Sequence, residues 1–357
     1  MPNPQLNRRD ALVGLAAAGT VLAVGAGGVA EASGWLDSQR LTSSRFADRF
    51  EQVYGRHNGF RRNHAKGLAA TGTFTGNGAG AELSRASVFA AATVPLTARF
   101  SLGGTVPDAA DQPSTVRGLG LMFHLPHGEQ WRTAMINLPV FPDSTPQGFF
   151  DRLLAGKPDP ATGQPDPTTM KAFLARHPET AMAMKVIKAT PPSSGLADST
   201  FHGLNAFIAT NDAGVSVPVR WAAVPMDPPG ESAPGGGGHD YLFDDLIRRM
   251  TRGPVSWRLE LTVAEPGDPT HDATLPWPAG RRTVDAGVIT VDAVLTEAAG
   301  NARDVNFDPL VLPEGLGPSD DPLPRARSAV YARSFERRAR EPKSPSAVDV
   351  AEVNRDH

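Results

Sequence analysis

The hydrophobic positions of this chain change their spacing as the sequence proceeds. Over residues 36–54 they recur at helical intervals, with Phe46, Phe50 and Val53 on one side, which predicts an amphipathic helix. Over residues 64–139 the apolar runs are short and are separated by Gly, Pro and Asn, which is typical of strands joined by turns. The pattern therefore predicts a helix that leads into a strand-rich domain.

Eight segments carry a strand pattern. They are residues 67–74, 87–100, 118–125, 131–140, 207–210, 215–223, 256–263 and 287–295. The turn at 211–214, with the sequence Asn-Asp-Ala-Gly, predicts a hairpin between the fifth and the sixth. Strands that follow one another in this way pair antiparallel, and closing them into a barrel leaves no free edge. We expect an α+β fold, an antiparallel eight-stranded β-barrel with surrounding helices.

The remaining periodic segments predict helices outside the barrel. These segments are residues 149–155, 170–189, 241–251 and 325–340. Residues 33–340 are expected to form the barrel domain. Residues 341–357 are polar and are expected to form a disordered tail.

The N-terminal residues 1–32 have the features of a targeting segment. Arg8 and Arg9 precede an apolar run over residues 11–30, and Ala-Glu-Ala at 30–32 forms a small-residue cleavage site. This combination predicts export by the twin-arginine route to the periplasm or another extracytoplasmic compartment. The alternative is a membrane anchor through residues 11–30, because about 20 apolar residues can cross a bilayer.

Composition narrows the chemistry that is available. The chain has 357 residues and a net charge of −3, so it offers no basic surface for nucleic acid. It contains no cysteine, which excludes disulfides, thiolate metal sites and cysteine nucleophiles. Any metal must therefore be held by nitrogen or oxygen ligands, or within a macrocycle.

Two short motifs near opposite ends of the chain carry candidate chemistry. Arg327 and Tyr331 are four residues apart, so on a helix their side chains share one face. An adjacent guanidinium and a ferric iron would both favour the tyrosine phenolate, whose unperturbed pKa is about 10. His64 follows an arginine-rich turn and could serve as a general acid-base. Each motif alone is also compatible with ordinary surface residues.

Several further segments, taken in chain order, resemble motifs of one known family. Residues 61–67, 94–101, 115–118, 138–141, 307–309 and 327–331 together resemble the haem catalases. The resemblance runs from about residue 45 to 340. The chain resembles the minimal branch of that family, the catalase-related peroxidases, because it has no counterpart of the long N-terminal arm and C-terminal additions of large catalases.

The resemblance implies a role for each matching residue and haem b as the cofactor. The distal acid-base would be His64, Ser101 would form a hydrogen bond within the distal pocket, and Tyr331 would be the iron ligand. The residues that it implies for cofactor binding are Arg61, Arg99 and Arg338 for the propionates, Arg327 beside the tyrosine, and Phe149 over the haem face. For Arg338, which lies in a basic run, a surface position is the alternative.

One departure bears on the reaction. Where catalases have two asparagines before the distal strand ends, this chain has Ile136 and Asn137, so the asparagine that contributes to the pocket is replaced by Ile136. A one-residue shift would instead bring Asn137 into the pocket. The expected function is an exported peroxidase that reduces hydrogen peroxide or organic peroxides through a ferryl haem, with a small organic electron donor.

Three other functions are compatible with the same resemblance. The chain could be a true catalase, a non-enzymatic haem-binding protein, or an enzyme that rearranges fatty acid hydroperoxides. An intact distal asparagine would favour the first of these, whereas His64 and Ser101 argue against pure binding. The oligomeric state is left open, a homo-oligomer included.

Overall fold

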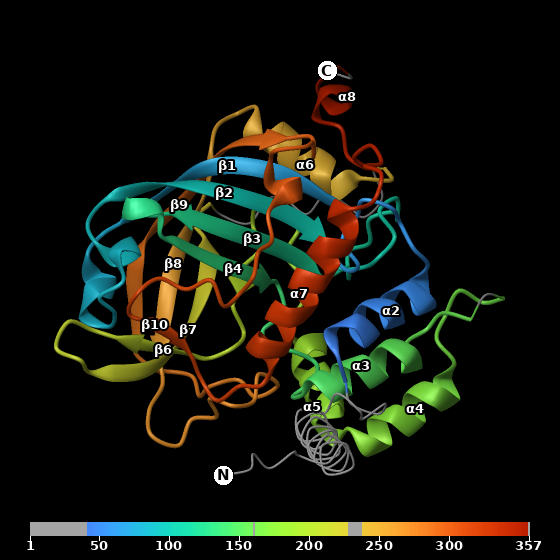
Figure 1. Cartoon of the computed structure of the whole chain (residues 1–357), viewed down its shortest axis with the longest axis horizontal. Coiled ribbons are helices and arrows are strands. Elements are labelled where there is room, and N and C mark those ends of the chain that lie inside the picture. The colour runs from blue at the N-terminus through green and yellow to red at the C-terminus, as the bar shows by residue number, and fades with distance from the viewer. Residues whose placement is uncertain (1–40, 160, 228–237, 356–357) are drawn as a thin grey trace, which may run out of the picture. The chain divides into compact units, whose positions relative to one another are not determined.

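The computed structural model describes residues 41–159, 161–227 and 238–355 (Figure 1). The predicted targeting segment, residues 1–32, lies outside the described residues. The barrel and its helices form one compact unit that starts at Ser43. Among the described residues, none of the helices has the length and apolar character needed to cross a bilayer.

The strands are antiparallel and belong to one sheet. Their bounds are β1 Gly67–Gly76, β2 Thr93–Leu102, β3 Arg117–His124, β4 Gln130–Ile136, β5 Phe201–His202, β6 Phe207–Thr210, β7 Ser216–Pro225, β8 Val255–Val263, β9 Thr283–Leu295 and β10 Leu316–Pro318. The order β7-β5-β4-β3-β2-β1-β9-β8 closes on itself because β8 also pairs with β7. The predicted eight-stranded antiparallel barrel is therefore confirmed.

The membership of the ring differs from the prediction in one strand. The predicted strand 207–210 exists as β6, but it pairs with β7 and β10 outside the ring. Its place is taken by β5, which joins β4 to β7 through the pair Ile136 and His202. The predicted segment 87–100 is also shorter, because Ser87–Phe89 is a 3₁₀ turn and β2 begins at Thr93.

The helices lie outside the barrel (Figure 1). They are α2 Ser43–Tyr54, α3 Pro146–Ala155, α4 Pro167–Arg176, α5 Pro178–Ala189, α6 Tyr241–Met250, α7 Leu323–Ala339 and α8 Val350–Arg355. The single helix predicted over 170–189 is wrong, because it is interrupted at His177. Proline restricts the residue before it, and Pro178 starts the next helix.

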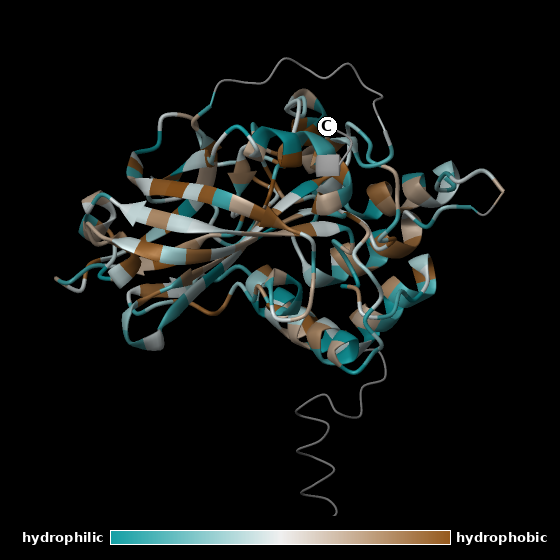
Figure 2. Cartoon of the chain, turned by 90° about the horizontal axis from the view of Figure 1, so that it is seen from above, coloured by the Kyte–Doolittle hydropathy of each residue, from teal (hydrophilic) through white to brown (hydrophobic). Residues whose placement is uncertain are grey.

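The barrel interior is the main hydrophobic core. Alternate residues of each strand point inward, so hydrophobic and hydrophilic residues follow one another along the strands (Figure 2). Aromatic rings fill the space: Trp131 stacks on Phe123 with ring centroids 4.7 Å apart and meets Trp221 edge-on at 5.1 Å.

The outer face of β2 to β4 lines a cavity, and β3 and β4 carry small residues there. Gly118 and Gly120 of β3 point outward, beside Ala134 and Ile136 of β4. Leu119 between them is fully buried inside. Helix α7 runs past the ends of these strands, and α2 and α3 pack beyond it (Figure 1). The small side chains therefore leave room between sheet and helix.

The expectation of a disordered tail after residue 340 is wrong for residues 341–355. Glu341 is buried and accepts hydrogen bonds from Arg62 at 2.5 and 3.0 Å and from the backbone of Gly59 at 2.9 Å. Val348 joins the hydrophobic core, and α8 packs against α6. The polar composition was misleading because a carboxylate with such partners can be buried.

Candidate active site

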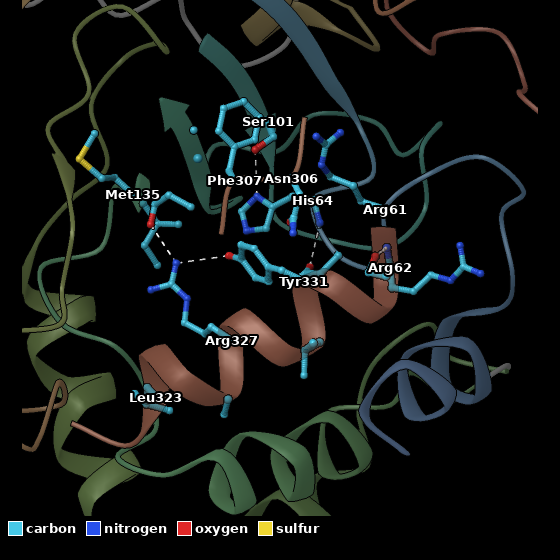
Figure 3. A pocket seen from close by; sticks show the side chains of 18 of the residues that line it. Arg61, Arg62, His64, Ser101, Met135, Asn306, Phe307, Leu323, Arg327 and Tyr331 are labelled. Atoms are coloured by element: carbon cyan, nitrogen blue, oxygen red, sulfur yellow. Dashed lines mark hydrogen bonds between the residues drawn. The ribbon is translucent and has the colours of Figure 1, made fainter. Parts of the chain in front are cut away.

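All eight predicted site residues line the same cavity. Figure 3 shows Arg61, His64, Ser101, Arg327 and Tyr331 around it. It has a volume of about 1280 Å³, counted with the solvent at its mouth. It lies between α7, α2 and α3 on one side and the outer face of β2 to β4 on the other. The eight residues are Arg61, His64, Arg99, Ser101, Phe149, Arg327, Tyr331 and Arg338.

The imidazole of His64 is held by the first two strands. His64 precedes β1, and its Nδ1 lies 3.0 Å from the hydroxyl oxygen of Ser101 on β2. Gly118 on β3 makes this possible, because an added Cβ would lie 2.7 Å from that hydroxyl and 3.0 Å from Nδ1. With Nδ1 engaged, Nε2 is the ring nitrogen left for a ligand in the cavity.

The backbone of His64 is strained. Its φ of 55° lies in the left-handed region, which costs a residue with a Cβ about 1–2 kcal/mol. The side chain of Asn63 supports this conformation by accepting hydrogen bonds from the backbone of His64 at 3.0 Å and of Gly104 at 3.2 Å. Strain of this kind is often found at functional sites.

The electrostatic surroundings keep His64 neutral. Burial, together with the charges of Arg99, Arg327 and Arg61, lowers the pKa of His64 to about 3. At neutral pH the imidazole therefore carries one proton and has one free lone pair. It can accept a proton without first losing one.

Helix α7 supplies the other half of the site. Arg327 and Tyr331 lie one turn apart, and Nη2 of Arg327 donates a hydrogen bond to the phenol oxygen of Tyr331 at 3.3 Å. The same Nη2 donates to the carbonyl of Ala134 on β4 at 3.0 Å. Tyr331 and His64 both point into the cavity, the one from the helix and the other from the sheet (Figure 3).

Two residues behind Arg327 were missed by sequence reasoning. Asn205 accepts a hydrogen bond from Nη1 of Arg327 at 2.6 Å and donates to the carboxylate of Asp321 at 2.8 Å. Asp321 is buried, and its other oxygen accepts from the backbone of Leu323 at 2.8 Å, at the start of α7. An aspartate just before a helix is a known capping signal that could have indicated Asp321. Nothing in the sequence indicated Asn205.

One end of the cavity is strongly positive. Arg61, Arg99 and Arg338 converge there, and burial with the charges of the other two lowers the pKa of Arg61 well below its usual range. Burial and Arg99 likewise lower the pKa of Arg338 to about 10. Burial is the larger cause of both shifts and the neighbouring guanidinium charges add to it, so an added anion would be stabilised there.

A buried glutamate accompanies these arginines and was also missed. Glu297 accepts from Nε of Arg99 at 2.7 Å and from Nη2 at 3.1 Å, and it lies 3.6 Å from Nη1 of Arg61. Three guanidinium groups and one carboxylate leave a net charge of +2. Within the described residues, this end of the cavity therefore suits an anionic ligand.

The opposite wall of the cavity is apolar. Phe149 on α3 packs against Phe46 and Phe50 of α2 and against Phe141, with ring centroids 5.7 to 6.1 Å apart. Leu323 and Val330 of α7 also line the cavity. The site thus combines an apolar body with a positive end, as expected for a pocket that binds a large amphipathic cofactor.

The alternative registers at Ile136 and Asn137 are resolved by the strand geometry. Ile136 lines the cavity, on the same outward row as Gly118. The side-chain oxygen of Asn137 instead accepts a hydrogen bond from the backbone of Arg117 at 2.8 Å. The apolar residue is therefore the one that faces the cavity.

Comparison with solved structures supports the fold. A bacterial catalase superposes with a TM-score of 0.68 at 20% identity, covering 85% of this chain and 62% of the solved chain. A fungal catalase gives a TM-score of 0.68 at 19% identity, covering 82% of this chain and 64% of the solved chain. The chain thus has a catalase-like barrel and spans less than two thirds of these longer chains.

Sequence comparison then defines the family. The Catalase family model matches residues 48–343, so the chain belongs to the catalase family. A catalase-related peroxidase of Synechococcus elongatus is 36% identical over 309 residues, 84% of this chain and 89% of that protein. Another catalase-related peroxidase, from Mycolicibacterium paratuberculosis, is 32% identical over 302 residues, which cover 84% of this chain and 95% of that protein. The predicted resemblance to this minimal branch of the family is confirmed.

Proposed function

We propose that this protein is a haem-dependent peroxidase that binds haem b through Tyr331. The observation that carries the proposal is the placement of Tyr331 and His64 in one cavity, at whose end Arg61, Arg99 and Arg338 have excess positive charge. The two catalase-related peroxidases among its relatives support the same activity. The substrates are a peroxide and a small organic electron donor.

The residues of the cavity fit this cofactor. The phenol oxygen of Tyr331 would bind the iron, and Arg327 would donate a hydrogen bond to that oxygen. Arg61 and Arg338 would bind the two propionates, whose charge of −2 matches the net +2 at that end. When bound, the haem supplies the redox centre at which the peroxide bond is reduced.

The chain itself supplies the proton transfer. The neutral imidazole of His64 can take a proton from the peroxide and return it to the oxygen that leaves as water or alcohol. Ser101 fixes the plane of the ring, so that Nε2 remains directed at the cavity.

The proposal is tested by reconstitution. Apoprotein titrated with ferric haem should bind one equivalent, with a spectrum characteristic of tyrosinate ligation. A peroxide and a phenolic donor should then give sustained donor oxidation. Failure to bind haem, or binding with no reaction with any peroxide, would contradict the proposal.

Ile136 favours peroxidase over catalase turnover. Dismutation needs a second hydrogen peroxide held by polar partners, and an apolar wall offers it no hydrogen bond. Ile136→Asn should therefore increase oxygen evolution from hydrogen peroxide without improving oxidation of a phenolic donor. The matched control is Ile136→Val, which should change neither. High oxygen evolution by the wild type, measured with an oxygen electrode, would instead indicate a true catalase.

The proposed site of action is outside the cytoplasm. The twin arginine at positions 8 and 9 and the Ala-Glu-Ala site support export by the twin-arginine route. Replacing Arg8→Lys and Arg9→Lys together should retain the protein in the cytoplasm, as measured by fractionation. Normal export of that double variant would show that another route is used, and recovery in the membrane fraction with an intact N-terminus would favour an anchor.

A further inference from the structure

Arg99 does more in this structure than line the positive end of the cavity. Its guanidinium has five N–H donors. Nε and one Nη2 proton bind Glu297, the other Nη2 proton binds the carbonyl of Ala65 at 3.2 Å, and Nη1 binds the carbonyl of His64 at 3.0 Å. Within the described residues, four of the five donors are thus engaged and one is left for a propionate.

The two carbonyls that Arg99 holds belong to the strained segment. His64 has a φ of 55°, and the next residue, Ala65, begins the approach to β1. Gly67 allows the close passage of the arginine, because an added Cβ would lie 2.3 Å from Nη2. The guanidinium therefore holds the backbone of His64 and Ala65 in place through two hydrogen bonds, and this backbone sets the position of the His64 imidazole.

Glu297 in turn fixes the guanidinium. Its side chain is 3% exposed and forms a bidentate pair with Arg99, a geometry that leaves little rotational freedom. Burial acts to raise the pKa of Glu297, but the charges of Arg99 and Arg61 outweigh it and keep the pKa below its usual value. The carboxylate is therefore ionised at neutral pH and can hold Arg99 throughout the working range.

We propose that Glu297 is a positioning residue for His64, acting through the fork of Arg99 on the carbonyls of His64 and Ala65. The effect of this role on peroxide chemistry rests on the proposed function. The hydrogen bonds by which Arg99 fixes the backbone of His64 and Ala65 do not depend on it. Arg99 is then chiefly a support for the distal histidine, and Arg61 and Arg338 bear most of the propionate binding.

The first experiment uses the haem-free protein. Amide hydrogen exchange at His64 and Ala65 should be about 10- to 100-fold faster in Glu297→Gln, because charge-assisted hydrogen bonds that close the segment are weakened. Arg99→Lys should give the same local increase, because lysine keeps a charge beside Glu297 but lacks the planar fork that binds the carboxylate and both carbonyls together. The second variant keeps the test decisive if the first does not fold.

Asp143→Asn is the matched control. Asp143 is buried, and both of its carboxylate oxygens accept from Nε of Arg152, at 3.0 and 2.8 Å; within the described residues no hydrogen bond or ion pair joins it to His64 or Arg99. This variant should leave exchange at His64 and Ala65 unchanged. The proposal would be overturned if His64 and Ala65 exchanged at the wild-type rate in both Glu297→Gln and Arg99→Lys. It would also be overturned if Asp143→Asn increased their exchange rates as much as those two variants do.

The second experiment uses the haem-loaded protein. Glu297→Gln should keep the haem spectrum of the wild type, because Tyr331 is untouched, yet react with peroxide at least about tenfold more slowly, because His64 is misplaced. An unchanged peroxide rate would overturn the role of Glu297. Absence of haem uptake by the wild type would instead contradict the proposed function. The exchange data would still show whether Glu297 and Arg99 fix the backbone at His64.

Discussion

Tyr331→Phe should abolish stable haem binding. The phenol oxygen of Tyr331 is directed into the cavity from α7 and accepts a hydrogen bond from Nη2 of Arg327 at 3.3 Å. The chain has no cysteine that could replace it. The haem-to-protein ratio and the absorption spectrum after reconstitution measure the effect. Haem should also raise the melting temperature of the wild type by mass action, and this increase should disappear in the variant.

Tyr241→Phe provides the control for that experiment. Tyr241 starts α6 and does not line the cavity, so its hydroxyl should have no influence on the spectrum. A Tyr331→Phe protein with full haem occupancy and an unchanged spectrum would show that another residue binds the iron. The proposed function would then lose its principal structural argument.

The barrel could be predicted from sequence because its strands have clear local signals. The hairpin at Asn211–Gly214 is an example: the turn closes with a hydrogen bond from Asn211 to Val215, and Gly214 takes a φ of 77°. The two-residue strand Phe201–His202 could not be predicted, because so short a segment has no period. Its pairing with β4 and β7 depends on the rest of the barrel being in place.

The candidate site was predictable to the extent that its residues stand in recognisable motifs. His64 and Tyr331 lie 267 positions apart in sequence, and only the fold brings them to one cavity. Glu297 and Asn205 stand in no motif. Their importance follows from long-range partners, Arg99 and Arg327, which sequence spacing cannot reveal.

His64→Ala should retain haem and lose most of the reaction with peroxide. A positioned acid-base group contributes about 10²- to 10⁴-fold, and the described residues that line the cavity include no second histidine and no carboxylate. His127→Ala is the control, because His127 also has a left-handed backbone, with a φ of 58°, but does not line the cavity. Stopped-flow measurement of the first reaction with peroxide gives the rates. An unchanged rate in His64→Ala would remove the distal role.

The pH dependence of that rate gives an independent check on His64. Only the neutral imidazole can accept the proton, so activity is lost as pH falls through the pKa of the group. Because burial and the nearby arginines lower this pKa to about 3, the rate should stay constant from pH 8 down to about pH 5. An ordinary histidine would instead cause a decline below its unperturbed pKa of about 6.5. A decline centred there would show that His64 is solvated in the working enzyme, and the buried, arginine-surrounded geometry would not describe its active form.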